Sequence, residues 1–297
     1  MSKGIEPRST TIHDLGLPLN VHLWGRPDAP PLLLLHGMRD QSRSWDPIAA
    51  ALLDRYHVIT PDLRGHGASG WASPEAYTLA AFVLDLALIV RALDLPPASL
   101  IGHSLGGAIA LRYAAAFPHQ VRALCAIEAV ELPIVRDHRH DPKPFPTRMR
   151  AWIDAEAQRR GRPRRRYESP ADAEIHLRRA QAGLDADTAA TLCRHALVQS
   201  DDGSWCWKYD PAARHRPPDD PGGEDLDEML AAIACPTMLA YGAASWIPLP
   251  PAERLARIKD VRVEHFPDSS HWLHLQARPA FLATLTRFLD QGPNRAA

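Results

Sequence analysis

Ser104 lies at the centre of the pattern Gly-x-Ser-x-Gly, where an apolar run ends and a helical pattern begins. A strand, a sharp turn and a helix lift a serine out of the backbone and present its hydroxyl as a nucleophile. Gly102 and Gly106 fit this context, because the turn is strained and side chains on either side of the serine would clash. We therefore predict that Ser104 is a nucleophile.

A serine hydroxyl is a weak nucleophile at neutral pH, so it needs a base within hydrogen-bond reach and a group that orients the base. Among the 15 histidines of the chain, His271 follows the last expected strand, Val261 to Phe266. We expect this position to bring His271 to the same sheet edge as Ser104. His274 is the alternative base, although it lies three residues farther on, at the expected start of the final helix.

The orienting acid is predicted to be Glu128. This residue ends the apolar strand expected at residues 123–128, and it follows Ser104 by 24 residues. A carboxylate at the end of an apolar strand is costly to desolvate unless it is paired. Glu131 is the competing candidate.

Attack on an acyl carbon creates an oxyanion, which needs preorganised donors such as two backbone N–H groups. We expect one donor to be the N–H of Leu105, next to the nucleophile. The second is expected to be the N–H of Met38, in the loop after the apolar run Leu32 to Leu35. His36-Gly37 could also be only a tight turn, although a glycine that lets backbone approach a ligand has the same geometry.

The elements that must hold these residues alternate between strands and helices. An opening hairpin is expected at residues 10–24, strands at 32–35, 57–61, 99–103, 123–128, 237–242 and 261–266, and helices at 45–53, 77–95, 105–117, 252–258 and 279–289. This alternation predicts an α/β fold with a mostly parallel sheet, whose strand carboxyl ends share one edge.

The alternation stops after Glu131, where helical segments rich in Arg, Ala and Pro follow. We expect a core in two parts, residues 1–130 and 229–297, and an inserted, mainly helical cap at 131–228. Trp152 and Trp246 are candidate apolar walls of a substrate pocket. Residues 159–166 hold six arginines in eight positions, and we interpret them as a solvated surface rather than an anion or nucleic-acid patch.

The composition and net charge of the chain indicate which kinds of partner it is expected to bind. The 297 residues are 45% hydrophobic and 23% charged, with a formal charge of -1, which gives no reason to expect nucleic acid or a membrane surface. The first ten residues lack the apolar core of a signal peptide, so a cytoplasmic location is expected. The four cysteines have no paired metal spacing and are interpreted as reduced. No metal or cofactor is expected.

Four motifs in this order resemble the α/β-hydrolase superfamily: residues 35–37 (Leu-His-Gly), 61–69 (Pro-Asp-Leu-Arg-Gly-His-Gly-Ala-Ser), 102–107 (Gly-His-Ser-Leu-Gly-Gly) and 270–272 (Ser-His-Trp). The resemblance covers roughly residues 10–130 and 230–290 and implies that fold, with residues 62–67 as a structural loop. The chain departs from the superfamily at Ser270, where glycine is more usual, and at residues 242–250, which hold no carboxylate where the acid usually lies. An acid 24 residues after the nucleophile is similar to haloalkane dehalogenases and zearalenone-lactone hydrolases, which favours Glu128.

The nucleophile type separates reaction classes. Relatives that attack a saturated carbon use aspartate, because serine would leave a stable ether. We therefore expect hydrolysis of a small apolar carboxylic ester or lactone through an acyl-enzyme. A hydrolase of carbon–carbon bonds in diketones and a non-catalytic receptor for a small ligand are the alternatives.

Overall fold

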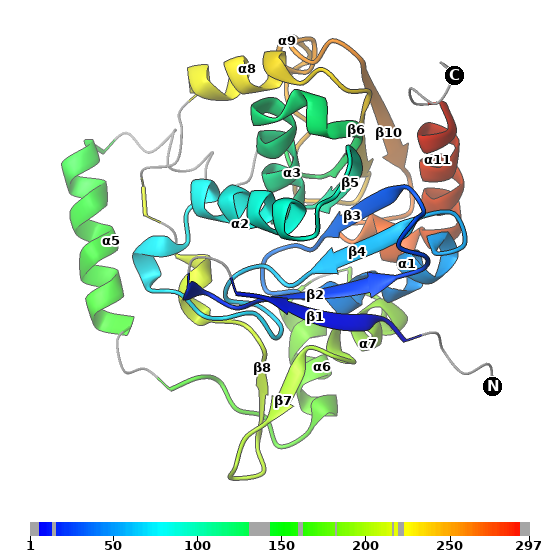
Figure 1. Ribbon diagram of the computed structural model, residues 1–297. Helices are drawn as coiled ribbons and strands as arrows, with labels where there is room; N and C mark the ends of the chain where they lie inside the picture. The colour runs from blue at the N-terminus through cyan, green and yellow to red at the C-terminus, as the bar shows by residue number, and fades with distance from the viewer. Residues whose placement is uncertain are drawn as a thin grey trace.

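The protein is built around an eight-stranded sheet, seen in a computed structural model that describes residues 6–13, 16–130, 143–159, 163–181, 183–215, 217–218 and 223–291. The strands lie in the order β1-β2-β4-β3-β5-β6-β9-β10 (Figure 1). β1 with β2 and β2 with β4 are antiparallel, and every other pair is parallel. The expected α/β fold with a mostly parallel sheet flanked by helices is confirmed.

The elements have the following bounds. The strands are β1 Arg8–Ile12, β2 Leu19–Trp24, β3 Pro31–Leu35, β4 His57–Pro61, β5 Ala98–His103, β6 Val121–Ile127, β7 Leu197–Gln199, β8 Trp205–Trp207, β9 Thr237–Gly242 and β10 Val261–Phe266. The helices are α1 Asp46–Leu52, α2 Leu79–Ala92, α3 Leu105–Ala116, α5 Phe145–Arg159, α6 Pro170–Ala180, α7 Ala186–Cys193, α8 Gly223–Ala232, α9 Ala252–Leu255, α10 Leu273–Gln276 and α11 Arg278–Gln291.

The four leucines of β3 show why this strand is central. Leu33 and Leu35 pack into the core cluster that holds the buried residues of α2, α3 and α8. Leu32 and Leu34 pack into the second cluster, with α1 and α11. Since side chains alternate along a strand, an unbroken apolar run is buried on both faces by helices. Figure 1 shows α2, α3 and α8 on one side of the sheet and α1 and α11 on the other.

The described residues between β6 and β9 contribute no strand to the main sheet. They form α5, α6, α7 and α8 together with an antiparallel hairpin of β7 and β8. The hairpin was not predicted, because strands of three residues are too short to show a period of two. Glu131 and residues 132–142 lie outside the described residues. The division into a core and a cap at 131–228 therefore remains a prediction.

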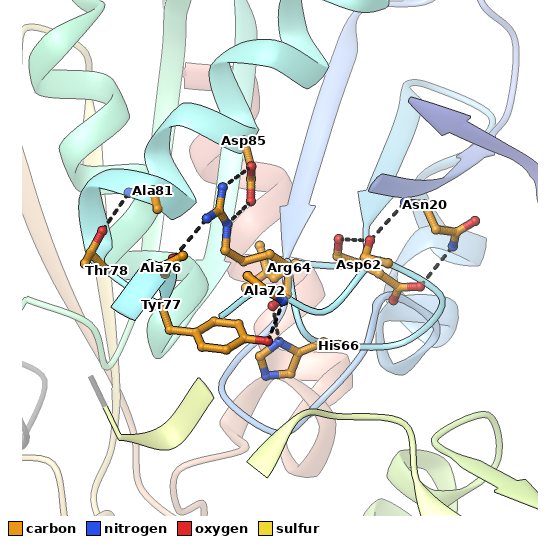
Figure 2. A network of polar contacts seen from close by, with 12 residues as sticks. Asn20, Asp62, Arg64, His66, Ala72, Ala76, Tyr77, Thr78, Ala81 and Asp85 are labelled. Carbon is orange, nitrogen blue, oxygen red and sulfur yellow. Dashed lines mark hydrogen bonds and ion pairs between the residues drawn. The ribbon is translucent and has the colours of Figure 1, made fainter. Parts of the chain in front are cut away.

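The loop after β4 is fixed by buried polar contacts. Arg64 forms a bidentate ion pair with Asp85 of α2, in which Nε and Nη2 each lie 2.6 Å from a carboxylate oxygen. Arg64 also donates to the carbonyl of Ala76 at 2.9 Å. At the other end of the loop, Asp62 accepts from the amide of Asn20 at 2.9 Å. Figure 2 shows these contacts around His66 and Tyr77. Paired buried charges hold a loop in one conformation, and this one reaches the candidate site described below.

The cysteines and the lengths of the helices bear on two of the expectations from the sequence. All four cysteines are buried free thiols. None of the described helices is long and apolar enough to span a membrane.

Candidate active site

Ser104 lies in the turn between β5 and α3. Its φ of 52° and ψ of -114° are strained for a residue with a side chain. The turn fits tightly, because a Cβ on Gly106 would lie 2.2 Å from the carbonyl oxygen of Leu35, and one on Gly102 would lie 2.4 Å from the backbone of Gly106. Both glycines of the motif are therefore required by close backbone contacts, as the sequence predicted.

Glu128 directly follows β6, the strand next to β5, and therefore lies beside Ser104. The register pairs His103 with Ile127, and the N–H of Ser104 donates to the carbonyl of Ile127 at 2.8 Å. Glu128 also has a positive φ, 50°. Of the four non-glycine residues with positive φ in the described chain, three lie at this edge, namely Arg39, Ser104 and Glu128. Strain of this kind gathers at functional sites.

The Glu128 carboxylate is fully buried and accepts three hydrogen bonds. Its Oε2 accepts from Nδ1 of His271 at 2.6 Å and from Oγ of Ser245 at 2.6 Å, and its Oε1 accepts from the N–H of Gly242 at 2.9 Å. The segment 242–250, which holds no acid, thus supplies donors to the acid on the adjacent strand. Nothing in the sequence pattern pointed to Ser245.

The imidazole of His271 is held by aromatic neighbours and through its backbone. Its ring centroid lies 5.0 Å from that of Trp246 and 5.2 Å from that of Trp272. Its carbonyl accepts from Nε2 of His103 at 2.9 Å, so Nε2 of His103 carries the proton. Burial lowers the pKa of His103, with smaller effects from the neighbouring imidazoles of His271 and His274, and this keeps His103 neutral. His103, the residue directly before the serine, thus positions the His271 loop.

The loop after β3 approaches Ser104 closely. A Cβ on Gly37 would lie 3.5 Å from Cβ of Ser104 and 2.9 Å from Nδ1 of His103. This leaves the neighbouring Met38 in the region expected of an oxyanion donor. On the other side, Leu105 is the first residue of α3, so its N–H has no partner within the helix.

His66 connects the loop after β4 to this region. Its Nε2 accepts from the N–H of Arg39 at 3.1 Å, which leaves Nδ1 to donate to the carbonyl of Arg64 at 2.9 Å. Burial, with a smaller effect of His36, lowers the pKa of His66 to about 3, so the acceptor is neutral at physiological pH. The structural loop 62–67 therefore also fixes the backbone next to Met38, a contact that the sequence did not reveal.

Asp40 is a buried carboxyl in the same loop. It accepts from the N–H of Gln41 at 2.8 Å and from Oγ of Ser44 at 2.9 Å. Burial raises its pKa to about 7. Asp40 lines a cavity of about 130 Å³ together with Met38 and Trp272. The cavity thus adjoins both the expected oxyanion donor and the residue after His271.

His274, the alternative base, lies in the core. It is fully buried, with ring centroids 4.6 Å from Trp45 and 4.6 Å from His103, and neither ring nitrogen has a hydrogen-bond partner among the described residues. Burial lowers its pKa to about 3. His271, not His274, contacts Glu128.

The isolation of His274 predicts an acid-sensitive fold. The unfolded state binds a proton near pH 6.5 that the folded state takes up only near pH 3, so the stability contribution is complete above pH 6.5 and falls as the pH decreases toward 3. His274→Leu should reduce the loss of unfolding free energy between pH 7 and pH 4.5 by roughly 2 kcal/mol, measured by urea denaturation. The variant should stay folded at pH 7, and an acid dependence equal to that of the wild type would contradict this interpretation.

The two candidate wall residues differ in position. Trp246 is 60% exposed and lies against His271. Trp152 is on α5, and its indole N–H donates to the carbonyl of His215 at 2.8 Å. Trp246 thus adjoins the candidate base, whereas Trp152 bonds to His215, which lies in the same segment between β6 and β9.

Several known proteins are similar to this chain in sequence. The family model described as alpha/beta hydrolase fold matches residues 30–166. The chain is 28% identical over 289 residues to the putative carbamate hydrolase RutD of Variovorax paradoxus, covering 92% of this chain and 96% of that protein. It is 37% identical over 110 residues to lipase LipV of Mycobacterium tuberculosis, covering 37% of this chain and 41% of that protein. An uncharacterized protein of Mycobacterium bovis is 40% identical over 101 residues, which are 34% of this chain and only 29% of that protein.

Solved structures share the fold over nearly the whole chain. The hypothetical protein PA1622 from Pseudomonas aeruginosa superposes with a TM-score of 0.85 at 22% identity, covering 97% of this chain and 100% of that chain. The Mycobacterium tuberculosis esterase Rv0045c superposes with a TM-score of 0.75 at 24% identity, covering 97% of this chain and 94% of that chain.

Proposed function

We propose that this chain, which has the α/β-hydrolase fold and matches the family model of that fold over residues 30–166, is a serine hydrolase of carboxylic esters or lactones. The observation that carries the proposal is the short contact of His271 with buried Glu128, beside a strained serine at the end of the adjacent strand. Relatives named as a lipase and a carbamate hydrolase support acyl chemistry of this kind.

The proposed mechanism begins with attack of the Ser104 hydroxyl on the acyl carbon. His271 accepts the serine proton at Nε2, while Glu128 holds its Nδ1–H and stabilises the imidazolium that forms. The N–H groups of Met38 and Leu105 donate to the oxyanion, and the second of these is at the positive end of the α3 dipole. The alcohol leaves with the proton from His271, and a water activated by His271 then hydrolyses the acyl-enzyme. This sequence requires no metal.

A fluorophosphonate probe tests the proposal directly, since it labels a serine only where a base activates it. We expect the folded protein to be labelled at Ser104 and to hydrolyse members of a panel of aryl esters, lactones, carbamates and diketones. EDTA should not reduce either signal. A folded protein that is neither labelled nor active on any member of the panel would be a ligand receptor instead.

A further inference from the structure

An open cavity of about 560 Å³ is lined on several sides by arginine side chains. Its five arginines are Arg39, Arg159, Arg164, Arg165 and Arg214. Three of them come from the arginine-rich segment 159–166, which the sequence analysis interpreted as a solvated surface. That interpretation fits Arg166, which is exposed and pairs with Asp202, and Arg165 is exposed as well. It does not fit Arg159 and Arg164, which are half-buried and line the cavity.

The cavity carries an excess of positive charge. Its two carboxylates are already engaged, because Glu156 pairs with Arg159, and Asp210 accepts from the hydroxyl of Tyr77 at 2.6 Å. Within the described residues, no carboxylate lies within ion-pair distance of Arg165 or Arg214. Guanidinium groups that gather in a hollow without carboxylate partners favour an anion.

The wall of the cavity around Tyr209 and Asp210 is bonded to the loop after β4. The backbone around Tyr209 bonds to the loop after β4, with Gly67 N–H donating to Lys208 at 2.7 Å and Asp210 N–H donating to Gly65 at 2.7 Å. Figure 2 shows Tyr77 beside Ala72 and His66. The hydroxyl of Tyr77 accepts from the N–H of Ala72 and donates to the carboxylate of Asp210. Walls that are fixed before binding cost less to order when a ligand arrives.

The arginine-lined cavity is continuous in its lining with the smaller cavity beside Met38 and Trp272. It shares Arg39, Arg165, Trp207 and Tyr209 with the cavity of about 130 Å³ that Met38 and Trp272 line. A substrate that reached Ser104 past Met38 could therefore extend one end among the arginines.

We propose that this cavity binds an anionic group, a carboxylate or a phosphate, that the ester substrate itself carries. The inference rests on the proposed ester hydrolysis and names its substrate class. The guanidinium groups hold the anion by charge-assisted hydrogen bonds, which places the ester at Ser104 and favours the anionic ester over a neutral ester of the same length.

Matched substrate pairs test the proposal through kcat/KM. On the acyl side, mono-4-nitrophenyl esters of dicarboxylic acids of increasing length are compared with 4-nitrophenyl esters of the corresponding fatty acids. On the alcohol side, 4-carboxyphenyl acetate is compared with its methyl ester, and 4-phosphonooxyphenyl acetate supplies the phosphate. We expect kcat/KM of the anionic ester to exceed that of its neutral partner by about 10- to 100-fold on the acyl side, the alcohol side or both. This ratio should decrease as the ionic strength rises.

Arginine variants assign the preference to the cavity. Arg165→Gln and Arg214→Gln should each reduce the preference several-fold, and together they should remove it, while turnover of the neutral esters stays unchanged. Arg166→Gln is the matched control, because it removes the same charge from the same segment outside the cavity. No preference in any arm, or an equal loss in the control variant, would overturn the proposal.

A binding measurement separates this inference from the proposed function. Titration calorimetry with the free dicarboxylates and with phenyl phosphate requires no turnover. Binding that the double arginine variant loses supports the anion site even if the protein hydrolyses no ester. Ester turnover without anion preference or binding would support the hydrolase and refute the site.

Discussion

Ser104→Ala is expected to lower kcat/KM for ester hydrolysis on the order of 10⁵-fold, because members of a Ser-His-acid group act as a unit and loss of the nucleophile removes nearly the whole effect. The backbone should tolerate the change, since alanine has a Cβ like serine at the same φ of 52° and fills no new space. Progress curves with a chromogenic ester measure the rate, and labelling by the fluorophosphonate should disappear.

A neighbouring serine provides the control. Ser270 lies next to His271 on the same edge, but its hydroxyl donates to Oε1 of Gln276 at 2.9 Å. Ser270→Ala should keep the labelling and most of the activity. Turnover near the wild-type level in the Ser104→Ala protein would refute the serine mechanism.

The parts of the fold that the sequence predicted depend on local patterns. The apolar run of β3 has to be buried on both faces, and the strand-turn-helix at residues 98–116 follows from Gly-x-Ser-x-Gly. Glu128 could be proposed because a carboxylate at the end of an apolar strand needs a partner. The expected end residues differ from the observed ones by a few positions, as where the helix expected at 77–95 is α2, Leu79–Ala92.

The contacts that the sequence could not reveal join residues far apart in the chain. His103 and the carbonyl of His271 are 168 residues apart, and Ser245 and Glu128 are 117 apart. No periodicity encodes such pairs; they exist only once the sheet has assembled. The arginine cavity has the same origin, since Arg164 stacks 4.8 Å from the ring of Trp71 and donates to the carbonyl of Trp207, two partners that lie on separate segments.

The position of His271 after the last strand favoured it over His274 in the sequence, and the three-dimensional structure gives the physical reason. Only three residues separate them, but α10 begins between them, at Leu273. The turn into this helix leaves His271 beside Glu128 and carries His274 into the core against Trp45. Residue type alone gave both histidines the same chemistry, so their different surroundings decide which can act as a base.

Glu128→Gln is expected to lower kcat/KM by about 10⁴-fold, the size of effect that follows when an amide replaces the acid of such a group. Three donors face the carboxylate, namely Nδ1 of His271, Oγ of Ser245 and the N–H of Gly242. A glutamine presents one oxygen and one NH₂ group. If the NH₂ faces His271, the imidazole must accept at Nδ1 and carry its proton on Nε2, where it cannot receive the serine proton. If the NH₂ faces Gly242 instead, two donors oppose each other in a buried site.

The pH–rate profile distinguishes a positioning role from a structural one. When the wrong tautomer blocks His271, removal of the serine proton depends on hydroxide, so kcat/KM of Glu128→Gln should keep rising with pH above neutrality, where the wild-type rate levels off. A fold defect would lower the rate without changing the shape of the profile. Ser245→Ala is the matched control, because it deletes one donor to the same carboxylate and leaves the charge in place, and it should cost about tenfold or less. Glu131→Gln completes the comparison: a larger loss there than in a folded Glu128→Gln protein would assign the acid to Glu131.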